Sequence, residues 1–157
     1  MKKTNAVRIL ERLKLSYNLR EFTVDSSDLS AERAAELLGF PVGQVFKTLV
    51  ARGDKSGIVV ATVPGGYELD LKRLARLSGN KKVEMVPLKE IQPLTGYIRG
   101  AVSPLGIKQN YPFYIDESVY GYSTVVVSAG LRGLQIEIAP EDLVTALGAV
   151  SGRLTRD

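Results

Sequence analysis

The sequence predicts a single α/β domain: a mixed, curved and partly barrel-like β-sheet wrapped by helices. Short apolar segments typical of strands follow one another through hairpin turns, and helical segments are interspersed without strict alternation. The chain has 157 residues, of which 45% are hydrophobic, so one sizeable core can form, and no Pro/Gly/Ser-rich linker divides it. We therefore expect one domain over residues 1–157, with a loosely held tail after about residue 148.

The first part of the chain predicts two helices with a strand between them. Thr4 is a suitable N-cap for a first helix, whose apolar residues recur at helical spacing. Residues 16–24 alternate imperfectly and indicate a strand at the edge of the core. Ser30 can begin the second helix, and Gly39 can end it.

The middle of the chain predicts a β-hairpin followed by a helix. Residues 45–52 and 58–63 are apolar strands, and the segment 53–57 between them has turn composition. A helix is expected over residues 70–77, and a short strand over residues 82–86.

The last part is richer in turns. Strands are expected at residues 113–116, 124–128 and 134–138, with a turn at 129–133 joining the last two. Pro140 suits the first position of a final helix.

The absence of two residue types restricts the chemistry. The chain contains no Cys and no His, which excludes a disulfide framework, a thiolate nucleophile, a Ser-His-Asp relay and an imidazole general base. The DxDxDG calcium pattern is also absent. An enzyme with this composition must use Lys, Asp, Glu, Tyr, Ser, Thr, backbone dipoles or the substrate itself, and we expect no metal and no cofactor.

The charge balance permits an anionic partner without requiring one. Lys and Arg total 21 against 17 Asp and Glu, for a formal charge of +4 and a pI near 9.3. The N-terminal residues are charged with no apolar stretch behind them, so we expect no signal peptide, and no apolar run is long enough to span a bilayer. The expected compartment is the cytoplasm.

Lys47 is a lone cation in the apolar strand segment Val-Phe-Lys-Thr-Leu-Val. By alternation it shares a face of that strand with Val45 and Leu49. Such a lysine either extends along a sheet edge to reach water or points into a pocket as a cation. In a pocket, its ammonium group could bind a carbonyl oxygen, a carboxylate or a phosphate.

Two Gly-containing segments, residues 96–106 and 128–133, each allow two interpretations. They are structural turns, or they are loops whose backbone N–H groups approach a ligand closely. Arg132 in the second segment either meets a phosphate or is a solvated hairpin charge.

Other charged residues suggest local roles. Asp25 and Asp28 lie in a Ser-rich segment and suit helix caps or turns. A basic cluster is either a solvated face or a surface that a nucleic acid can use; it comprises Arg73, Arg76, Lys81 and Lys82.

Three motifs occur in a family-like order: a Lys-Thr strand at residues 44–49, a Gly…Ser-Pro-Leu-Gly loop at 100–106, and a Ser-x-Gly-x-Arg-Gly turn at 128–133. Shorter segments at 69–72, 81–85, 95–97, 134 and 136–137 extend the pattern. In order and spacing, the chain resembles the YbaK family of free-standing trans-editing proteins from its first helix to about Leu147. It is also similar to the editing domain inserted in bacterial prolyl-tRNA synthetases.

The resemblance implies an aminoacyl-tRNA deacylase of translation fidelity that clears Cys-tRNA(Pro), or also Cys-tRNA(Cys), without cofactor or metal. Its partners would be the acceptor end of the aminoacyl-tRNA and prolyl-tRNA synthetase, with no membrane. In a YbaK-like mechanism the cysteinyl thiol attacks its own ester, which makes the reaction lyase-type; attack by water would make it a hydrolysis. The alternatives are a deacylase for Ala or another small amino acid, and a non-catalytic module that binds aminoacyl-tRNA or a synthetase.

The resemblance also implies a set of site residues. Lys47 would be the principal catalytic residue, and Gly100 would expose backbone donors. Phe22 stands where a Tyr is common in the family, and Gln135 stands where close relatives have an Asp. The substrate-binding residues implied in this way are Phe22, Thr48, Gly100, Ser103, Pro104, Ser128, Gly130 and Gln135.

Overall fold

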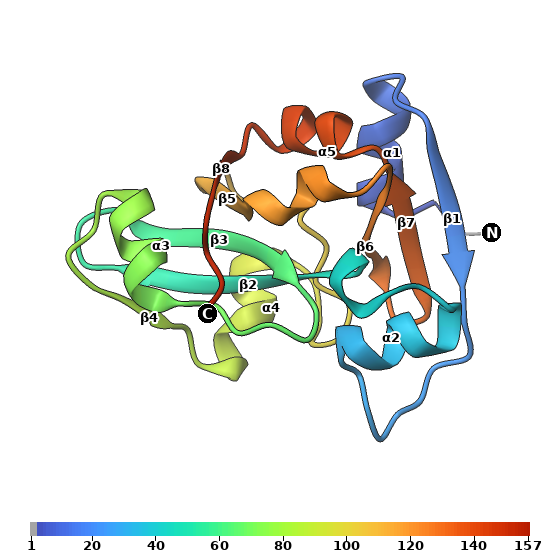
Figure 1. Cartoon of the computed structure of the whole chain (residues 1–157), viewed down its shortest axis with the longest axis horizontal. Coiled ribbons are helices and arrows are strands. Elements are labelled where there is room, and N and C mark those ends of the chain that lie inside the picture. Colours follow the sequence, from blue (N-terminus) through green and yellow to red (C-terminus); the bar gives the residue numbers. More distant parts are fainter. Residues whose placement is uncertain (1–2) are drawn as a thin grey trace.

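The computed structural model describes residues 3–157, which form two β-sheets with helices around them (Figure 1). The first sheet has three antiparallel strands in the order β1-β7-β6. These strands are β1 (Tyr17–Glu21), β7 (Leu134–Ile138) and β6 (Val125–Leu131). A bulge between Ser128 and Leu131 interrupts the pairing of β6 with β7, within the predicted turn region.

The second sheet has five strands in the order β4-β2-β3-β5-β8. Its strands β4, β2 and β3 are antiparallel, whereas β5 runs parallel to β3, and β8 runs parallel to β5. They are β2 (Phe46–Gly53), β3 (Gly57–Pro64), β4 (Val83–Met85), β5 (Phe113–Asp116) and β8 (Val150–Gly152).

An isolated parallel bridge between Val45 and Val126 joins the two sheets just before β2 begins. The predicted mixed sheet with interspersed helices is therefore confirmed. The strands described in residues 3–157 do not close into a barrel, since no pairing joins β4 back to the first sheet. The beginning of β2 therefore lies where the two sheets meet.

The helices begin and end where local sequence signals require. The Thr4 hydroxyl accepts the Val7 amide at 3.2 Å, the Ser30 hydroxyl accepts the Arg33 amide at 3.1 Å, and Gly39 ends its helix in the left-handed region. The helices are α1 (Asn5–Arg12), α2 (Ala31–Leu38), α3 (Leu71–Ser78), α4 (Ile91–Thr95) and α5 (Pro140–Leu147), and 3-10 turns lie at Val42–Gln44, Leu88–Glu90 and Glu117–Gly121. None of the helices described is long and apolar enough to cross a membrane.

The core is divided between the two sheets. One cluster packs α1 and α5 against the first sheet and includes Leu10, Phe46 and Ile136. A second cluster packs α3 against the five-stranded sheet and includes Val63 and Leu74. Both clusters draw on residues from β2 or its partner strand, so the packing holds the beginning of β2 from both sides.

The chain after residue 148 differs from the loosely held tail expected from the sequence. Strand β8 extends the five-stranded sheet, and Leu154 is fully buried in the second core cluster. The Leu154 amide donates to Asp116 Oδ1 at 2.8 Å, and its carbonyl accepts the Asp70 amide at 2.7 Å. These partners lie far away in the sequence, so composition gave no sign of them. The short α4, which contains Pro93, was also not predicted.

Candidate functional site

A free strand edge of β2 opens onto a cavity. Strand β2 is bridged to β6 at Val45 and pairs with β4 only from Ala51 onward. The stretch between these two pairings therefore has no strand on the side opposite β3. A cavity of about 320 Å³ opens there, between β2, the segment that leads into α2, and the β6–β7 turn.

Backbone groups of β2 face this open edge. The Val50 carbonyl accepts the Val86 amide at 3.2 Å, so Val50 directs its backbone groups away from β3. Successive residues of an antiparallel strand alternate in this direction. Thr48, two residues earlier, therefore also turns its amide and carbonyl toward the edge, and it lines the cavity. This arrangement offers a ligand a backbone donor and acceptor.

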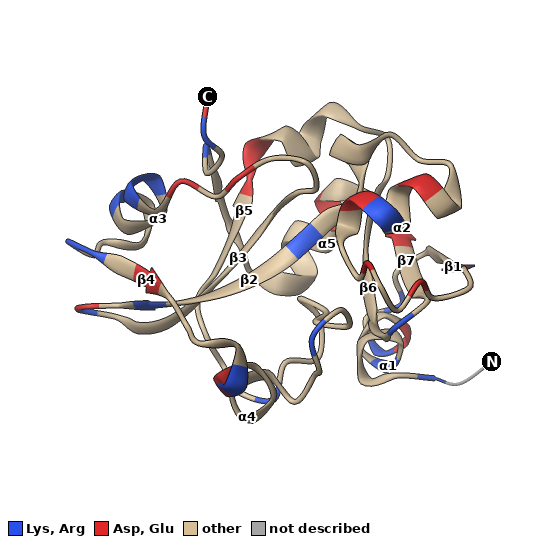
Figure 2. Cartoon of the chain, turned by 90° about the horizontal axis from the view of Figure 1, so that it is seen from below, with Lys and Arg blue, Asp and Glu red and all other residues tan. Residues whose placement is uncertain are grey.

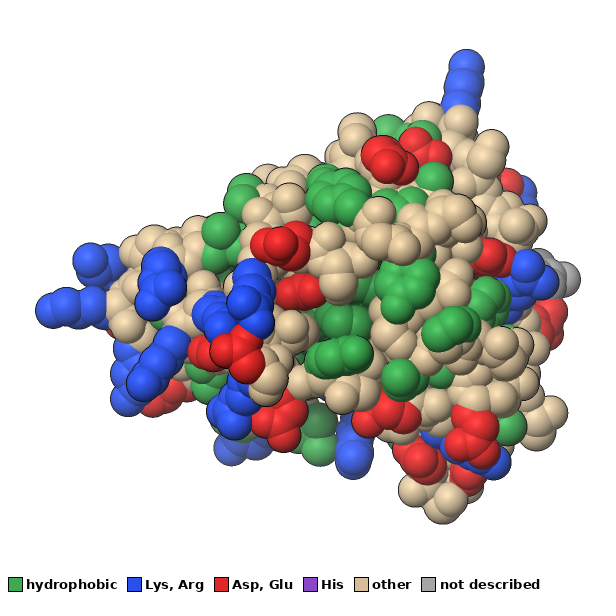
Figure 3. Space-filling model, viewed as in Figure 1, with side chains coloured by type: hydrophobic (Ala, Val, Ile, Leu, Met, Phe, Trp, Pro, Cys, Tyr) green, Lys and Arg blue, Asp and Glu red, His purple; other side chains and the backbone are tan. Residues whose placement is uncertain are grey.

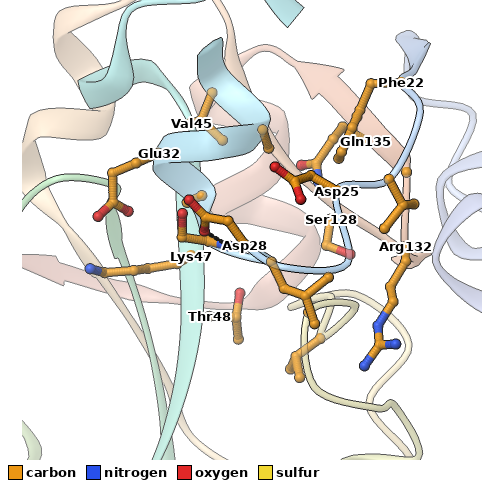
Figure 4. A pocket seen from close by; sticks show the side chains of 18 of the residues that line it. Phe22, Asp25, Asp28, Glu32, Val45, Lys47, Thr48, Ser128, Arg132 and Gln135 are labelled. Atoms are coloured by element: carbon orange, nitrogen blue, oxygen red, sulfur yellow. Dashed lines mark hydrogen bonds between the residues drawn. The ribbon is translucent and has the colours of Figure 1, made fainter. Parts of the chain in front are cut away.

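Lys47 brings a cation to the same edge. It is half-buried, pairs with Val63 in the register of β2 and β3, and lines the cavity. Its ammonium group forms no ion pair with any carboxylate in residues 3–157. In Figure 4 the side chain runs from β2 beneath Glu32. Of the two interpretations left open by the sequence, Lys47 combines both: it lies at a sheet edge and on a pocket wall.

Acidic side chains form the opposite wall, which we call the acidic roof: Asp25, Asp28 and Glu32. Asp25 accepts hydrogen bonds from Ser27 and from Arg33 Nε, the latter at 3.0 Å, and these contacts lower its pKa. The hydrogen bond from Ser30 lowers the pKa of Asp28. Of the predicted turn and cap roles, the turn role is confirmed, because each carboxylate accepts the amide two residues further on, whereas Ser30 is the cap of α2. Both carboxylates are negatively charged at neutral pH and add negative potential to the cavity.

The third wall comes from β6, β7 and the turn between them. The Ser128 hydroxyl accepts the Gly130 amide at 3.1 Å, which leaves its proton free to be donated. Gln135 is buried and lines the cavity, and its side-chain amide has no hydrogen-bond partner within residues 3–157. Arg132 Nε donates to the Arg99 carbonyl at 3.0 Å, so its guanidinium is held at the far side of the cavity from Lys47 (Figure 4).

Gly100 lines the cavity with a backbone that only glycine adopts easily. Its φ is +83°, and a Cβ atom there would lie 3.0 Å from Leu29 Cβ. Glycine therefore lets the 96–106 loop approach the segment before α2, and this contact closes one side of the cavity.

The structure brings together six of the nine residues that the sequence assigned to the site, and three lie elsewhere. Ser103, Pro104 and Gly130 do not line the cavity. The six that line it are Phe22, Lys47, Thr48, Gly100, Ser128 and Gln135.

Ser103 and Gly130 belong to a brace around Tyr97, and Pro104 lies between Ser103 and Leu105 in the same loop. The Tyr97 hydroxyl donates to the Leu105 carbonyl at 2.6 Å, and the buried Ser103 hydroxyl accepts the Leu105 amide at 3.2 Å. A Cβ atom on Gly130 would lie only 2.7 Å from the Tyr97 ring. Burial raises the pKa of Tyr97 to about 12, so its hydroxyl stays protonated and keeps donating. The Ser-Pro-Leu-Gly motif thus supports the cavity wall from behind.

Sequence reasoning did not place the acidic roof in the site. The segment 24–30 has turn composition, which predicts its local hydrogen bonds correctly. Nothing in that composition indicates that the segment folds back over β2. The position of this segment near Lys47 depends on the bridge between Val45 and Val126, which joins residues far apart in the sequence. No group of three or more metal-ligating side chains occurs in the described residues.

The fold and the site together define a class: a small α/β module with a cavity at a free strand edge, lined by an unpaired lysine, backbone donors and hydroxyl and amide groups. The model of the aminoacyl-tRNA editing domain matches residues 27–146. The chain belongs to this aminoacyl-tRNA editing domain family, which confirms the resemblance seen in the sequence.

Relatives extend this finding over nearly the whole chain. The chain is 50% identical over 153 residues to the Enterococcus faecalis protein named "Putative Cys-tRNA(Pro)/Cys-tRNA(Cys) deacylase EbsC", covering 98% of this chain and 93% of that one. It is 29% identical over 107 residues to proline–tRNA ligase of Staphylococcus aureus (strain Newman), covering 68% of this chain and 18% of the ligase.

Solved structures agree on the fold. A crystal structure described as "a putative trans-editing enzyme for prolyl tRNA synthetase" superposes with a TM-score of 0.82 and 29% identity, covering 100% of both chains. A crystal structure described as hypothetical protein APE2540 superposes with a TM-score of 0.88 at 24% identity, covering 98% of this chain and 100% of that one.

Proposed function

We propose that this protein is a cytoplasmic trans-editing deacylase that removes cysteine from Cys-tRNA(Pro), and also from Cys-tRNA(Cys). The observation that carries the proposal is the unpaired Lys47 beside the outward-facing backbone of Thr48, inside a cavity of about 320 Å³. Family membership and the 50% identical Enterococcus protein support the same activity.

The reaction needs no nucleophile from the protein, which has neither Cys nor His. The cysteinyl thiol attacks the carbonyl carbon of its own ester. A C–S bond forms, the C–O bond to the ribose breaks, and the thiol proton passes to the departing ribose oxygen. The products are a cyclic thiolactone and free tRNA. Correct orientation of such an internal attack lowers the barrier by about 7–11 kcal/mol.

The cavity residues supply orientation and charge stabilisation. The Lys47 ammonium and the Thr48 amide stabilise the negative charge that develops on the carbonyl oxygen, and a positioned donor of this kind contributes on the order of 3 kcal/mol. The Ser128 hydroxyl and the Gln135 amide have free hydrogen-bonding capacity toward the substrate. Asp28, in the acidic roof, attracts the positively charged α-ammonium group of the aminoacyl moiety.

A basic surface at the other end of β2 supports binding of the tRNA body. We define the basic end as the exposed cations Lys55, Lys72, Arg76 and Lys81, none of which pairs with a carboxylate in residues 3–157. Figure 3 shows Lys and Arg side chains gathered at this end of the molecule. Phosphates of an acceptor stem would be attracted there while the 3′ end enters the cavity.

A deacylation panel with purified protein and no synthetase tests the proposal. Cys-tRNA(Pro) and Cys-tRNA(Cys) should be deacylated, whereas Ser-, Ala- and Pro-charged tRNA should remain charged because they lack the thiol. Thiolactone recovered before free cysteine would establish the internal attack. Efficient release of alanine or serine would show an attacking water and a deacylase for small residues instead. Binding of aminoacyl-tRNA without any turnover would show a non-catalytic module.

A further inference from the structure

An apolar groove adjoins the cavity on the side toward β4. Its volume is about 300 Å³, and it shares Thr48, Gly100 and Val102 with the cavity, so the two spaces are continuous along the free edge of β2. The remaining walls are almost entirely apolar and include Leu49, Met85, Leu88 and Ile91.

The groove keeps large apolar side chains in contact with water. Leu88 is 59% exposed and Met85 is 44% exposed, although the core clusters lie close by. Scattered exposed apolar residues are common, but these two line one groove that continues a functional cavity. A ligand with a flat apolar face would remove both from water.

Two arginines flank the junction between the cavity and the groove. Arg132 lines the cavity, Arg99 lines the groove, and the hydrogen bond from Arg132 Nε to the Arg99 carbonyl holds the two turns together. Neither guanidinium pairs with a carboxylate in the part of the chain that the structure describes. A phosphodiester at this junction would meet two positive charges.

We propose that the groove is a stacking subsite for the nucleobase of the 3′-terminal adenosine. This inference rests on the proposed function, because it places the aminoacyl ester in the cavity and the base of the same nucleotide in the groove. Gly100 lines both spaces, so the ribose that links ester and base would lie beside its backbone. Among the described residues, Thr48 and Arg99 are the only groove side chains with polar groups, so the groove holds a base by its face.

A binding experiment tests the subsite independently of catalysis. The probe is an uncharged acceptor-stem minihelix with 2-aminopurine in place of the terminal adenine. Binding to wild-type protein should change its fluorescence, and Leu88→Ser should weaken binding by about 3- to 10-fold, toward the lower part of the range for base stacking because the partner is aliphatic. Leu13→Ser is the matched control, since Leu13 is 48% exposed at the end of α1, outside both spaces.

The outcomes separate this inference from the proposed function. Equal affinities of Leu88→Ser and wild type, or equal losses in Leu88→Ser and Leu13→Ser, would overturn the subsite. If only Leu88→Ser loses affinity for the minihelix, and wild type does not deacylate Cys-tRNA, the subsite is supported and the proposed deacylase activity is excluded. With turnover present, Leu88→Ser should raise KM for 3′-O-cysteinyl-adenosine by the same 3- to 10-fold and leave the rate on cysteine methyl ester, which has no base, unchanged.

Discussion

Charged side chains gather around a cavity at the beginning of strand β2, whereas they are exposed and dispersed beyond its end. At its beginning, Lys47 faces a cavity under Asp25 and Asp28, and hydrogen bonds hold these carboxylates in place. Beyond its end, the lysines and arginine of the basic end are exposed and spread over the hairpin, α3 and the segment before β4 (Figure 2). Charges that converge on a cavity act at contact distance on one ligand atom, whereas dispersed charges act collectively on a polyanion.

The largest effect is expected at the converging end. Lys47→Ala should slow single-turnover deacylation of Cys-tRNA(Pro) by about 10²-fold or more, because it removes a donor from the developing oxyanion. The defect should lie in the rate constant and should be the same at low and high salt, since a contact inside a cavity is weakly screened.

Lys108→Ala is the matched control, because Lys108 is exposed and lines neither the cavity nor the groove. A Lys47→Ala rate close to wild type would exclude Lys47 from the mechanism. A defect that disappears at saturating tRNA would mean that Lys47 attracts tRNA, as the basic end does, and does not act on the reacting ester. The contrast between the two ends of β2 would then be wrong.

The next effect belongs to the basic end. Replacing Lys55, Lys72 and Lys81 together by Ala should lower kcat/KM for Cys-tRNA(Pro) on the order of 10-fold at low salt. The slope of log KM against log salt concentration should fall by about 1 for each phosphate that no longer meets a lysine. The rate on 3′-O-cysteinyl-adenosine, which has no acceptor stem, should not change.

A control of equal charge distinguishes a specific surface from a general effect. Arg8, Lys14 and Lys108 are cations away from the basic end, and their replacement by Ala removes the same three charges. Equal losses in both triple variants would mean that net charge alone attracts tRNA. If kcat/KM is unchanged in both triple variants, the basic end is a solvated surface that does not bind tRNA.

The sequence predicted the parts of this contrast that depend on local pattern. The apolar strand pattern singled out Lys47 but left two interpretations open, and the family resemblance implied its site role. The caps at Thr4 and Ser30 follow from short-range hydrogen bonding. The 100–106 loop was recognised, but its Ser103 and Pro104 support the wall instead of lining it. Turn residues predict the local backbone conformation of a loop. They do not predict which distant segment that loop contacts.

The remaining parts depend on contacts between distant segments. The acidic roof forms because the segment before α2 and the first turn of α2 lie near β2. Leu154 is buried where the chain continues past β8, which pairs with β5. Neither contact has a local signature, since Asp25 satisfies its turn in the same way whether or not a cavity lies beneath it. Long-range pairing therefore had to be observed.

The smallest effect expected is on the pH dependence of thermal stability, which we compare for one carboxylate from each end of β2. Asp25 is hydrogen-bonded by Ser27 and by the Arg33 guanidinium, whereas Asp54 in the hairpin accepts the amides of Lys81 and Lys82 at 3.0 and 3.1 Å. These hydrogen bonds lower the pKa of both groups below the ordinary 3.8. Their stabilisation is therefore complete above about pH 4 and is lost as the pH falls through the lowered pKa.

Substitution should separate the two carboxylates, because an Asn oxygen can still accept backbone amides but cannot form an ion pair. Asp25→Asn, which loses its Arg33 partner, should lower Tm at pH 7 on the order of 2 °C, and the difference from wild type should vanish in acid below the lowered pKa. Asp54→Asn should lower Tm less, and the exposed Glu117→Gln serves as the control. Equal shifts for Asp25→Asn and Asp54→Asn would show that the Arg33 contact adds nothing. The acidic roof would then owe its position to backbone hydrogen bonds alone, as the hairpin does.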